Sequence, residues 1–413
     1  MIARPAIQAE AVVTSEIDTQ DEIVPTSGPQ EVAPHTRHHL WAVPLAVLGL
    51  AALFAVIAAS VLPGSIVAEN ATGETATFAR VPAEAQPVAD RLSFDAVERY
   101  PAEGTLLFVT VREPKVTMLD WFVGAHQSEV VFLTTQEKFG VQTPEQQRQI
   151  SVQMMRSAKE TAEYVALETL GFPVDIVPGE VIVSQMLCLQ PNEATQQCDE
   201  WAPSDELLDP GDKLLSVDGQ ELTTIDDLSA ILKKHQPGDM VPVEFDRPGS
   251  GEQSGEVELI ASNDGTDRTI IGFVPFDTST AKLPFDVSID SGAIGGPSAG
   301  LAFTLTLIDE LTPGELTGGN AVAVTGTIRL DGTVGAIGGL VQKASAAMQM
   351  GSKVFIVPFE QGEENLAQAR AVAGDDLEIV PVKDVDEALA ALAKFGGNGL
   401  ELGQPGADFD PAA

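Results

Sequence analysis

The stretch Gly-Gly-Pro-Ser-Ala-Gly at positions 295–300 stands directly before an apolar run that ends at Leu311, and this pairing decides the fold of the C-terminal region. The glycines and the proline predict a tight turn, and the run after them is apolar on most faces, as in a buried helix. Ser298 would then lie at a helix N-terminus, beside unpaired backbone N–H groups and the positive end of the helix dipole. Such groups can hold an oxyanion, so the turn predicts a nucleophilic serine.

A second glycine-rich turn carries the candidate base. Lys343 follows Ser298 by 45 residues and stands just behind Gly338-Gly339, at the start of a predicted helix. Its neighbours between positions 337 and 347 are mostly apolar, and burial among apolar groups lowers the pKa of a lysine. The other lysines of this region have more polar surroundings (Lys282, Lys353, Lys383 and Lys394). Lys343 is therefore the best candidate for the group that activates the serine.

A histidine base is the alternative. The five histidines (35, 38, 39, 126 and 235) all lie outside the segment 269–395 that contains Ser298. A triad would have to recruit His126 or His235 across domains.

The same segment alternates strand and helix patterns. A β-branched and aromatic run at Val354–Pro358 predicts a buried strand, and helices are expected over 365–373 and 385–394. Asp331-Gly332 is most simply a hairpin turn between Ile328 and Val334.

Near the N-terminus, residues 40–62 form an uncharged apolar run of 23 residues, and a bilayer core needs about 20. Trp41 suits an interface anchor, and Pro63-Gly64 would end the helix. A buried core helix and a cleaved signal peptide are the alternatives, but the length of the run favours an uncleaved anchor. Arg37 on the N-terminal side favours a cytoplasmic N-terminus and C-terminal domains outside the cytoplasm. Residues 1–39 are acidic and predict a disordered tail.

Between the anchor and the serine segment, a helix is predicted from Pro144 to Leu170, and β-rich sequence follows. The order of strand, Pro210–Gly219 (Pro-Gly-Asp-Lys-Leu-Leu-Ser-Val-Asp-Gly), helix over 225–234 and hairpin resembles a PDZ domain of the bacterial protease type, over residues 165–262. PDZ domains bind extended chain ends by strand addition. Leu170-Gly171-Phe172 resembles their carboxylate-cradling loop, although it equally fits an ordinary helix terminator. The insertion 188–206 departs from the usual pattern and leaves the state of the groove open.

Two cysteines, Cys188 and Cys198, enclose nine residues in a polar stretch. They cannot form a four-ligand zinc site by themselves. A disulfide across a surface loop would fit an extracytoplasmic domain, and two unrelated free thiols are the alternative.

Charge excludes one class of function. The chain has 413 residues and a formal net charge of -38, so it would repel nucleic acid. It has no glycine-rich phosphate loop with a following lysine, so we expect no nucleotide. We expect no cofactor and no metal.

The motifs around Ser298 also resemble a known family. Gly-Pro-Ser-Ala-Gly, Thr317-Gly318-Gly319, the stretch 325–328 (Thr-Gly-Thr-Ile), the glycine ladder 332–339 and Lys343 match, in order, the Lon-type serine protease domain. With the anchor and the PDZ-like part, the chain looks like the membrane-anchored PDZ–Lon proteases of bacteria. The resemblance implies Ser298 as nucleophile, Lys343 as general base and Thr325 as the hydroxyl that orients the lysine. It also implies a homo-oligomeric ring such as a hexamer. Lon enzymes usually have an acid three residues before the serine, where this chain has Gly295, so the gating of the site stays open.

These observations predict a chain of mixed α/β and α+β class. Its parts are an acidic tail (1–39), one transmembrane helix (40–62), a linker and β/helix segment (63–164), a PDZ-like domain (165–262), a Lon-type α/β proteolytic domain (263–395) and a disordered tail (396–413). We expect a single-pass protein of the cell membrane that binds lipid through this helix and hydrolyses extracytoplasmic polypeptides without ATP. The alternative is a membrane-tethered PDZ scaffold or chaperone with a catalytically silent Lon-like domain.

Overall fold

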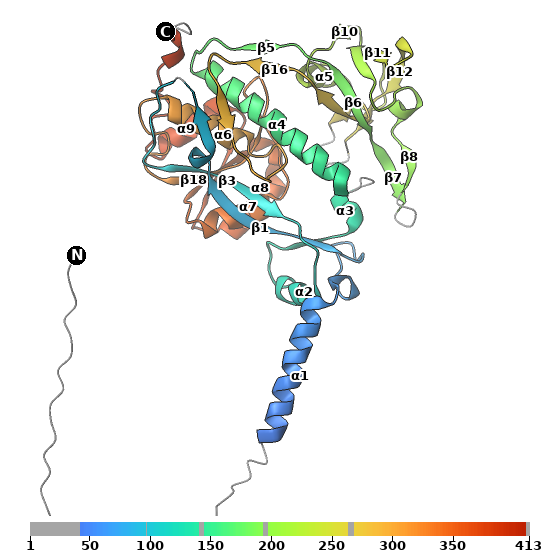
Figure 1. The fold of residues 1–413 in the computed structure, drawn as a ribbon, viewed down its shortest axis with the longest axis vertical. Helices are drawn as coiled ribbons and strands as arrows, with labels where there is room; N and C mark the ends of the chain where they lie inside the picture. Colours follow the sequence, from blue (N-terminus) through green and yellow to red (C-terminus); the bar gives the residue numbers. More distant parts are fainter. Residues whose placement is uncertain (1–41, 96, 140–143, 193–196, 263–267, 410–413) are drawn as a thin grey trace, which may run out of the picture. The chain divides into compact units, whose positions relative to one another are not determined.

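A computed structural model describes residues 42–95, 97–139, 144–192, 197–262 and 268–409 (Figure 1). Its contacts divide the chain into Met1–Phe54 and Ala55–Ala413. The described part of the first unit belongs to the helix α1 (Ala42–Val61). Pro44–Val61 of this helix is long and apolar enough to cross a membrane, and none of it is buried. The predicted tail 1–39 and the first two residues of the predicted membrane segment lie outside the described residues.

A six-stranded mixed sheet organises the second unit. Its strand order is β22-β21-β18-β3-β1-β4. The strands β18, β21 and β22 run parallel, β18 is also parallel to β3, and β1 pairs antiparallel with β3 and β4. The bounds in chain order are β1 (Phe78–Pro87), β3 (Thr105–Arg112), β4 (Val131–Leu133), β18 (Ala321–Val324), β21 (Val354–Pro358) and β22 (Glu378–Val382).

Helices cover both faces of this sheet, and strand alternation explains why. In β3, Leu106 and Phe108 point into one core, while Leu107 and Val109 point into the other. The first core is filled by three helices, α4 (Pro144–Thr169), α6 (Gly300–Leu311) and α9 (Val385–Lys394). The second core is filled by α7 (Leu340–Gln349) and α8 (Gly362–Ala373). All twelve residues of α6 are buried, which confirms the helix predicted after Ser298.

A second six-stranded sheet forms the β-rich region. Its order is β12-β11-β9-β6-β15, with β10 beside β9, and it has its own core. Its elements are β6 (Val181–Met186), β9 (Lys213–Val217), β10 (Gln220–Glu221), α5 (Ile225–Leu232), β11 (Met240–Arg247), β12 (Gly251–Glu258) and β15 (Phe273–Asp277). Thr224 caps α5 through a reciprocal pair of bonds with Asp227. The predicted helix behind Thr223-Thr224 is thus confirmed.

The remaining elements are short. Five two-stranded ladders join β2 (Leu92–Phe94) to β17 (Val287–Ile289), β5 (Asp175–Val177) to β16 (Thr280–Lys282), β7 (Cys188–Asn192) to β8 (Gln197–Trp201), β13 (Ile260–Ala261) to β14 (Thr269–Ile270) and β19 (Thr327–Ile328) to β20 (Val334–Gly335). The short helices are η1 (Gly64–Ile66), η2 (Ala89–Arg91), α2 (Met118–Gly124), α3 (Thr135–Phe139), η3 (Pro203–Glu206), η4 (Phe359–Gln361) and η5 (Pro405–Asp408). The β7–β8 hairpin is closed by the disulfide Cys188–Cys198, so the structure has the bridge rather than free thiols.

Two expected boundaries differ from the structure. The segment 63–164 is more than a linker, because β1, β3 and β4 lie in the same sheet as β18 and α4 packs on α6. The disordered tail expected over 396–413 is wrong as far as Phe409. Here the chain folds back, Gly406 N–H donates to Leu170 O at 3.1 Å, and the ring of Phe409 contacts those of Phe172 and Phe285. An apolar ring that reaches a core is held there, even in glycine-rich sequence.

Candidate active site

Ser298 lies in the turn before α6, half-buried, at the carboxyl side of the central strand β18. Backbone bonds fix this turn. Gly326 N–H donates to Ser298 O at 3.0 Å, and Leu301 N–H donates back to Gly326 O at 3.1 Å. A Cβ at Gly300 would lie 2.7 Å from the side chain of Ile328, so only glycine lets α6 begin this close to β19. The predicted serine-bearing turn is therefore anchored between a buried helix and the sheet.

The structure brings the three predicted site residues together. Lys343 Nζ lies 2.8 Å from Ser298 Oγ and 3.0 Å from Thr325 Oγ1. The Thr325 hydroxyl in turn donates to Ser298 O at 3.0 Å. Thr325 directly follows the strand β18. Lys343 lies in the first turn of α7, where its N–H donates to Gly339 O. Strand and helix thus present an amine and a hydroxyl to one serine.

The lysine amine is buried. Lys343 is 2% exposed, and burial lowers its pKa from the ordinary value to about 7, with a further contribution from the positive charge of Arg80. Arg80 binds Glu113 at 2.7 Å, and its side chain packs against Gly339 at the start of α7. Near neutral pH a large share of the Lys343 amine is uncharged and able to accept a proton.

The helix α4 packs directly on the serine turn. Gly296 N–H donates to Ser151 O at 2.7 Å, and a Cβ at Gly295 would lie 2.8 Å from Ser151 Cβ. The position where Lon enzymes usually have an acid is thus in contact with α4, which leaves little room for any side chain there. Sequence reasoning missed both Ser151 and Arg80. Each lies far from Ser298 in the chain, and neither belongs to a motif.

A cavity of about 920 Å³ opens beside the serine. Ser298 and Lys343 line it together with the residues of the turn, the α4 side chains Ser151 and Met154, and Arg80. Its lining combines apolar groups with a few polar ones that converge on the serine turn, as is usual for a substrate site. His126 and His235, both described, are not among the lining residues, and His235 is bound to Asp218 at 3.2 Å. Within the described part of the chain, no group of three His, Cys, Asp or Glu residues is placed to hold a metal ion.

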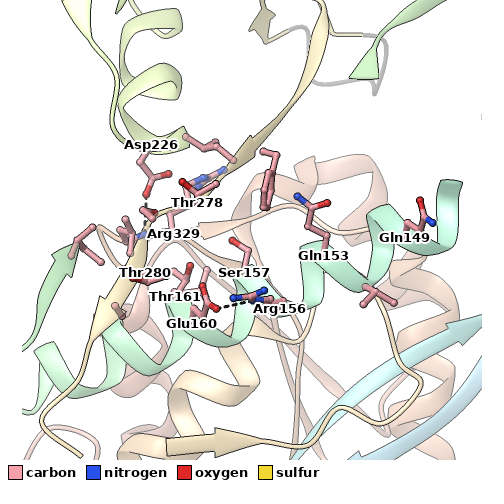
Figure 2. A pocket seen from close by; sticks show the side chains of 18 of the residues that line it. Gln149, Gln153, Arg156, Ser157, Glu160, Thr161, Asp226, Thr278, Thr280 and Arg329 are labelled. Carbon is pink, nitrogen blue, oxygen red and sulfur yellow. Dashed lines mark hydrogen bonds and ion pairs between the residues drawn. The ribbon is translucent and has the colours of Figure 1, made fainter. Parts of the chain in front are cut away.

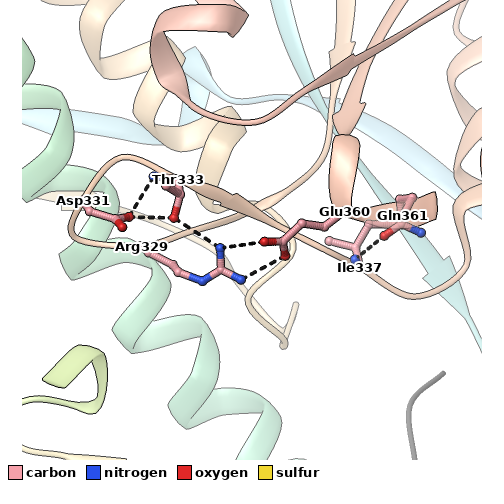
Figure 3. A network of polar contacts seen from close by, with 6 residues as sticks. All are labelled: Arg329, Asp331, Thr333, Ile337, Glu360 and Gln361. Carbon is pink, nitrogen blue, oxygen red and sulfur yellow. Dashed lines mark hydrogen bonds and ion pairs between the residues drawn. The ribbon is translucent and has the colours of Figure 1, made fainter. Parts of the chain in front are cut away.

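A polar network holds the segment between Thr325 and Lys343 (Figure 3). Asp331 accepts from the backbone and hydroxyl of Thr333 and so closes the predicted β19–β20 turn. Arg329 reaches from this hairpin to Glu360 at 3.0 Å. Ile337 N–H donates to Gln361 Oε1 at 2.6 Å, which fixes the glycine-rich approach to α7. These contacts position the helix that carries the lysine.

A second cavity, of about 800 Å³, lies on another face of α4 (Figure 2). Its walls come from α4, where Arg156 and Glu160 form an ion pair, from the β15–β16 connection, and from the first turn of α5. Arg329 and Leu330 of the β19–β20 hairpin complete it, and Leu330 N–H donates to Asp226 Oδ2 at 3.2 Å. The β-rich region therefore contacts the β19–β20 hairpin. This hairpin begins next to Gly326, whose N–H donates to Ser298 O.

Comparison with known proteins agrees with this geometry for the C-terminal region. Residues 278–394 match the Lon protease (S16) C-terminal proteolytic domain. A Lon protease of Trichlorobacter lovleyi is 42% identical over 112 residues, which is 26% of this chain and 13% of that protein. A Lon protease of Xanthomonas oryzae is 44% identical over 110 residues, which is again 26% of this chain and 13% of that protein. Lon protease 2 of Bacillus subtilis is 38% identical over 96 residues, which is 23% of this chain and 16% of that protein. The chain thus spans about an eighth of the length of the first two relatives.

Solved structures are similar to about a quarter of the chain. A PDZ domain of an SdrC-like protein from Listeria monocytogenes is 17% identical with a TM-score of 0.19, and the match covers 24% of this chain and 88% of that one. The PDZ domain of an SdrC-like protein from Listeria innocua is 20% identical with a TM-score of 0.17. That match covers 22% of this chain and 92% of the other one. Scores this low carry no functional argument. The serine and the lysine, in contrast, both fall inside residues 278–394, the segment that matches the Lon protease (S16) C-terminal proteolytic domain.

Proposed function

We propose that this chain is a membrane-anchored, ATP-independent serine endopeptidase in which Ser298 is the nucleophile and Lys343 the general base. The observation that carries the proposal is the 2.8 Å contact between Lys343 Nζ and Ser298 Oγ, made by an amine that is 2% exposed. A buried, uncharged lysine beside a serine hydroxyl is the arrangement that nucleophilic catalysis needs when no histidine is present. The match of residues 278–394 to a proteolytic domain supports the same reaction.

The proposed chemistry uses one proton acceptor throughout. The neutral amine of Lys343 takes the hydroxyl proton as Ser298 Oγ bonds to the carbonyl carbon of a peptide. The resulting ammonium then protonates the leaving amine, the C–N bond breaks, and an ester remains on Ser298. The amine, neutral again, deprotonates a water that hydrolyses the ester. Thr325 accepts from Nζ and donates to Ser298 O, and so holds the lysine toward the serine.

The wider setting belongs to the same proposal. The apolar helix α1 would anchor the protein in the cell membrane, with its C-terminal domains outside the cytoplasm. The disulfide Cys188–Cys198 supports an oxidising compartment. The PDZ-like region would recruit or gate polypeptide substrates, and the bond from Leu330 N–H to Asp226 offers a physical link from it to the serine turn. Polypeptides are the proposed substrates, and a homo-oligomeric ring such as a hexamer is the proposed assembly.

The dyad is tested with the full chain and an unfolded protein substrate. Ser298→Ala and Lys343→Ala should each lower the cleavage rate by at least about 1000-fold, because each removes a member of one catalytic unit. Thr325→Val should lower it roughly tenfold to hundredfold, since a hydrogen bond to the active amine is worth about 1.5–3 kcal/mol. Thr325→Ser keeps the hydroxyl and should retain most of the rate.

Matched controls come from exposed positions. Ser250→Ala in the β11–β12 turn and Lys353→Ala before β21 should leave the rate unchanged. Full cleavage by both dyad variants would refute the assigned residues. A wild-type chain that binds unfolded protein but cleaves nothing in any assembled form would instead support the scaffold alternative.

A further inference from the structure

The short helix α2 (Met118–Gly124) is bonded to the end of α1. Met118 N–H donates to Leu62 O at 3.1 Å, one residue after α1 ends at Val61. Gly64 N–H donates to Val116 O at 2.7 Å, and a Cβ at Gly64 would lie 2.6 Å from the Val116 side chain. The helix η1 packs against α2 at the same place (Figure 1). The start of α2 therefore cannot move away from the point where the apolar helix ends.

The side chains around this junction are apolar and exposed. Phe122 is 67% exposed and Val123 55% exposed on α2, and Ile66 of η1 is 63% exposed. These three residues are called the α2–η1 surface below. Large apolar residues exposed singly are common on soluble proteins. Here three of them stand on two elements in contact, directly after an apolar helix that is itself exposed along its length.

The charges of α2 do not oppose an apolar environment. Asp120 is its one charged residue, and it is used in the helix cap: it accepts from Thr117 N–H at 2.9 Å while Asp120 N–H donates to Thr117 Oγ1. Trp121, half-buried, adds the kind of side chain that is enriched where lipid headgroups meet the acyl chains.

We infer that the α2–η1 surface lies in the headgroup region of the leaflet from which α1 emerges, with Phe122, Val123 and Ile66 inserted among the lipids. The inference rests on the proposed membrane anchor, and extends it from one spanning helix to a second, interfacial contact. Short apolar helices beside a membrane bury their apolar face about 5–10 Å into the headgroup and acyl boundary. Such a contact would fix the height and tilt of the proteolytic domain above the bilayer.

The test places a fluorescent reporter at the surface itself. The full chain, with Trp41, Trp121 and Trp201 changed to Phe, carries Phe122→Trp and is reconstituted in phosphatidylcholine vesicles. Lipids brominated near the carbonyl end of the acyl chain should quench this tryptophan at least about twofold, because the bromines lie at the expected depth. The matched control carries Phe359→Trp at a site that is 48% exposed, and it should not be quenched.

A second variant tests whether the apolar character of the α2–η1 surface causes its contact with lipid. Adding Val123→Asp to the Phe122→Trp reporter should reduce the quenching by bromolipid to near the control value, since a carboxylate disfavours the apolar phase. Alkaline carbonate extraction of the same vesicles tests the membrane anchor separately from the lipid contact of the α2–η1 surface. Release of the protein would refute the membrane anchor and the surface with it. Retention without quenching at position 122 would refute the surface alone. Shielding of the reporter from aqueous acrylamide, without bromolipid quenching, would show that a second copy of the chain covers it and would also overturn the inference.

Discussion

At the scale of single residues, the site depends on where one amine is buried. Lys343 shares its surroundings with Thr325, which is fully buried, and with the half-buried Ser298. Desolvation destabilises the ammonium form, and Arg80 destabilises it further. The base role proposed for the lysine depends on this environment, because a lysine in water would be protonated at neutral pH.

This environment predicts the pH dependence of the reaction. The pKa of Lys343 is lowered to about 7, so below this value the protonated amine cannot accept the serine proton. Acylation of Ser298 by a fluorophosphonate should therefore fall about tenfold per pH unit below pH 7 and level off above it. Arg80→Gln should move the midpoint to higher pH, because a positive charge is removed, while Arg370→Gln on α8 should leave it in place, because Arg80 is the arginine whose charge lowers the pKa of Lys343. A profile that is flat from pH 5 to pH 9 would contradict Lys343 as the base.

Sequence patterns predicted Ser298 and Lys343, and the resemblance to the Lon-type domain added Thr325. The structure brings the three together, and their catalytic roles remain predictions. Ser298 and Lys343 could be found because each follows a glycine-rich turn at the start of an apolar helix. Ser151 and Arg80 could not, since no local pattern marks them and only the tertiary fold brings them to the site. Long-range contacts of this kind are not encoded in periodicity.

At the scale of elements, α4 is the clearest case of such a contact. Its start at Pro144 and its end before Gly171 were predictable from capping and breaking residues. Its partner was not, because an amphipathic pattern identifies a buried face and not what covers it. The turn before Ser298 supplies part of that cover through Gly295 and Gly296.

The contact predicts the effect of adding a methyl group. Gly295→Ala would place a Cβ 2.8 Å from Ser151 Cβ and 3.2 Å from the Ser151 carbonyl, so α4 must shift. We expect a loss of about 1–3 kcal/mol of stability, measured by denaturant unfolding, together with reduced acylation of Ser298. Ser151→Gly in the same chain removes the closest atom and should restore part of both. Wild-type stability in Gly295→Ala would show that α4 does not pack on the turn.

The prediction of a disordered segment over residues 396–409 was wrong. The composition is rich in Gly, Asp and Pro, and it gives no sign that the ring of Phe409 packs against Phe172 and Phe285. Phe409→Ala should cost about 1–2 kcal/mol, less than a fully buried phenylalanine, because the ring is only partly buried. It should also raise the rate of proteolysis between residues 396 and 409. Leu400→Ala removes an exposed side chain of the same segment and serves as the control. Equal protease sensitivity of both variants and the wild type would contradict the docked segment.

At the scale of the whole molecule, the disulfide and the apolar helix make one joint prediction about location. If the domains after α1 lie outside the cytoplasm, Cys188 and Cys198 are oxidised in cells and resist a thiol-reactive polyethylene glycol until a reductant is added. External protease should then digest the PDZ-like region in intact spheroplasts. Thiols that react without reductant, in a domain protected from external protease, would place it in the cytoplasm instead.

The fold class of each part was predictable from alternating strand and helix patterns, but the division into parts was not. Strand pairing links β3 to β18 across more than two hundred residues, and no local signal records this. The predicted boundary after residue 164 came from the extent of the PDZ resemblance over residues 165–262. Hydrogen bonding in the large sheet does not follow this boundary, because β1, β3 and β4 share that sheet with strands of the C-terminal region.

One consequence follows from that shared sheet for any attempt to produce the catalytic part alone. A recombinant piece cut at residues 278 and 394 would keep Ser298 and Lys343 but lose β3, leaving one side of β18 without its hydrogen-bonding neighbour. It would also lose α4 and expose the apolar flank of α6 to water. Such a piece should aggregate on expression, and the minimal soluble product that contains the candidate site must begin upstream of β1 and carry the β-rich region as an internal insert.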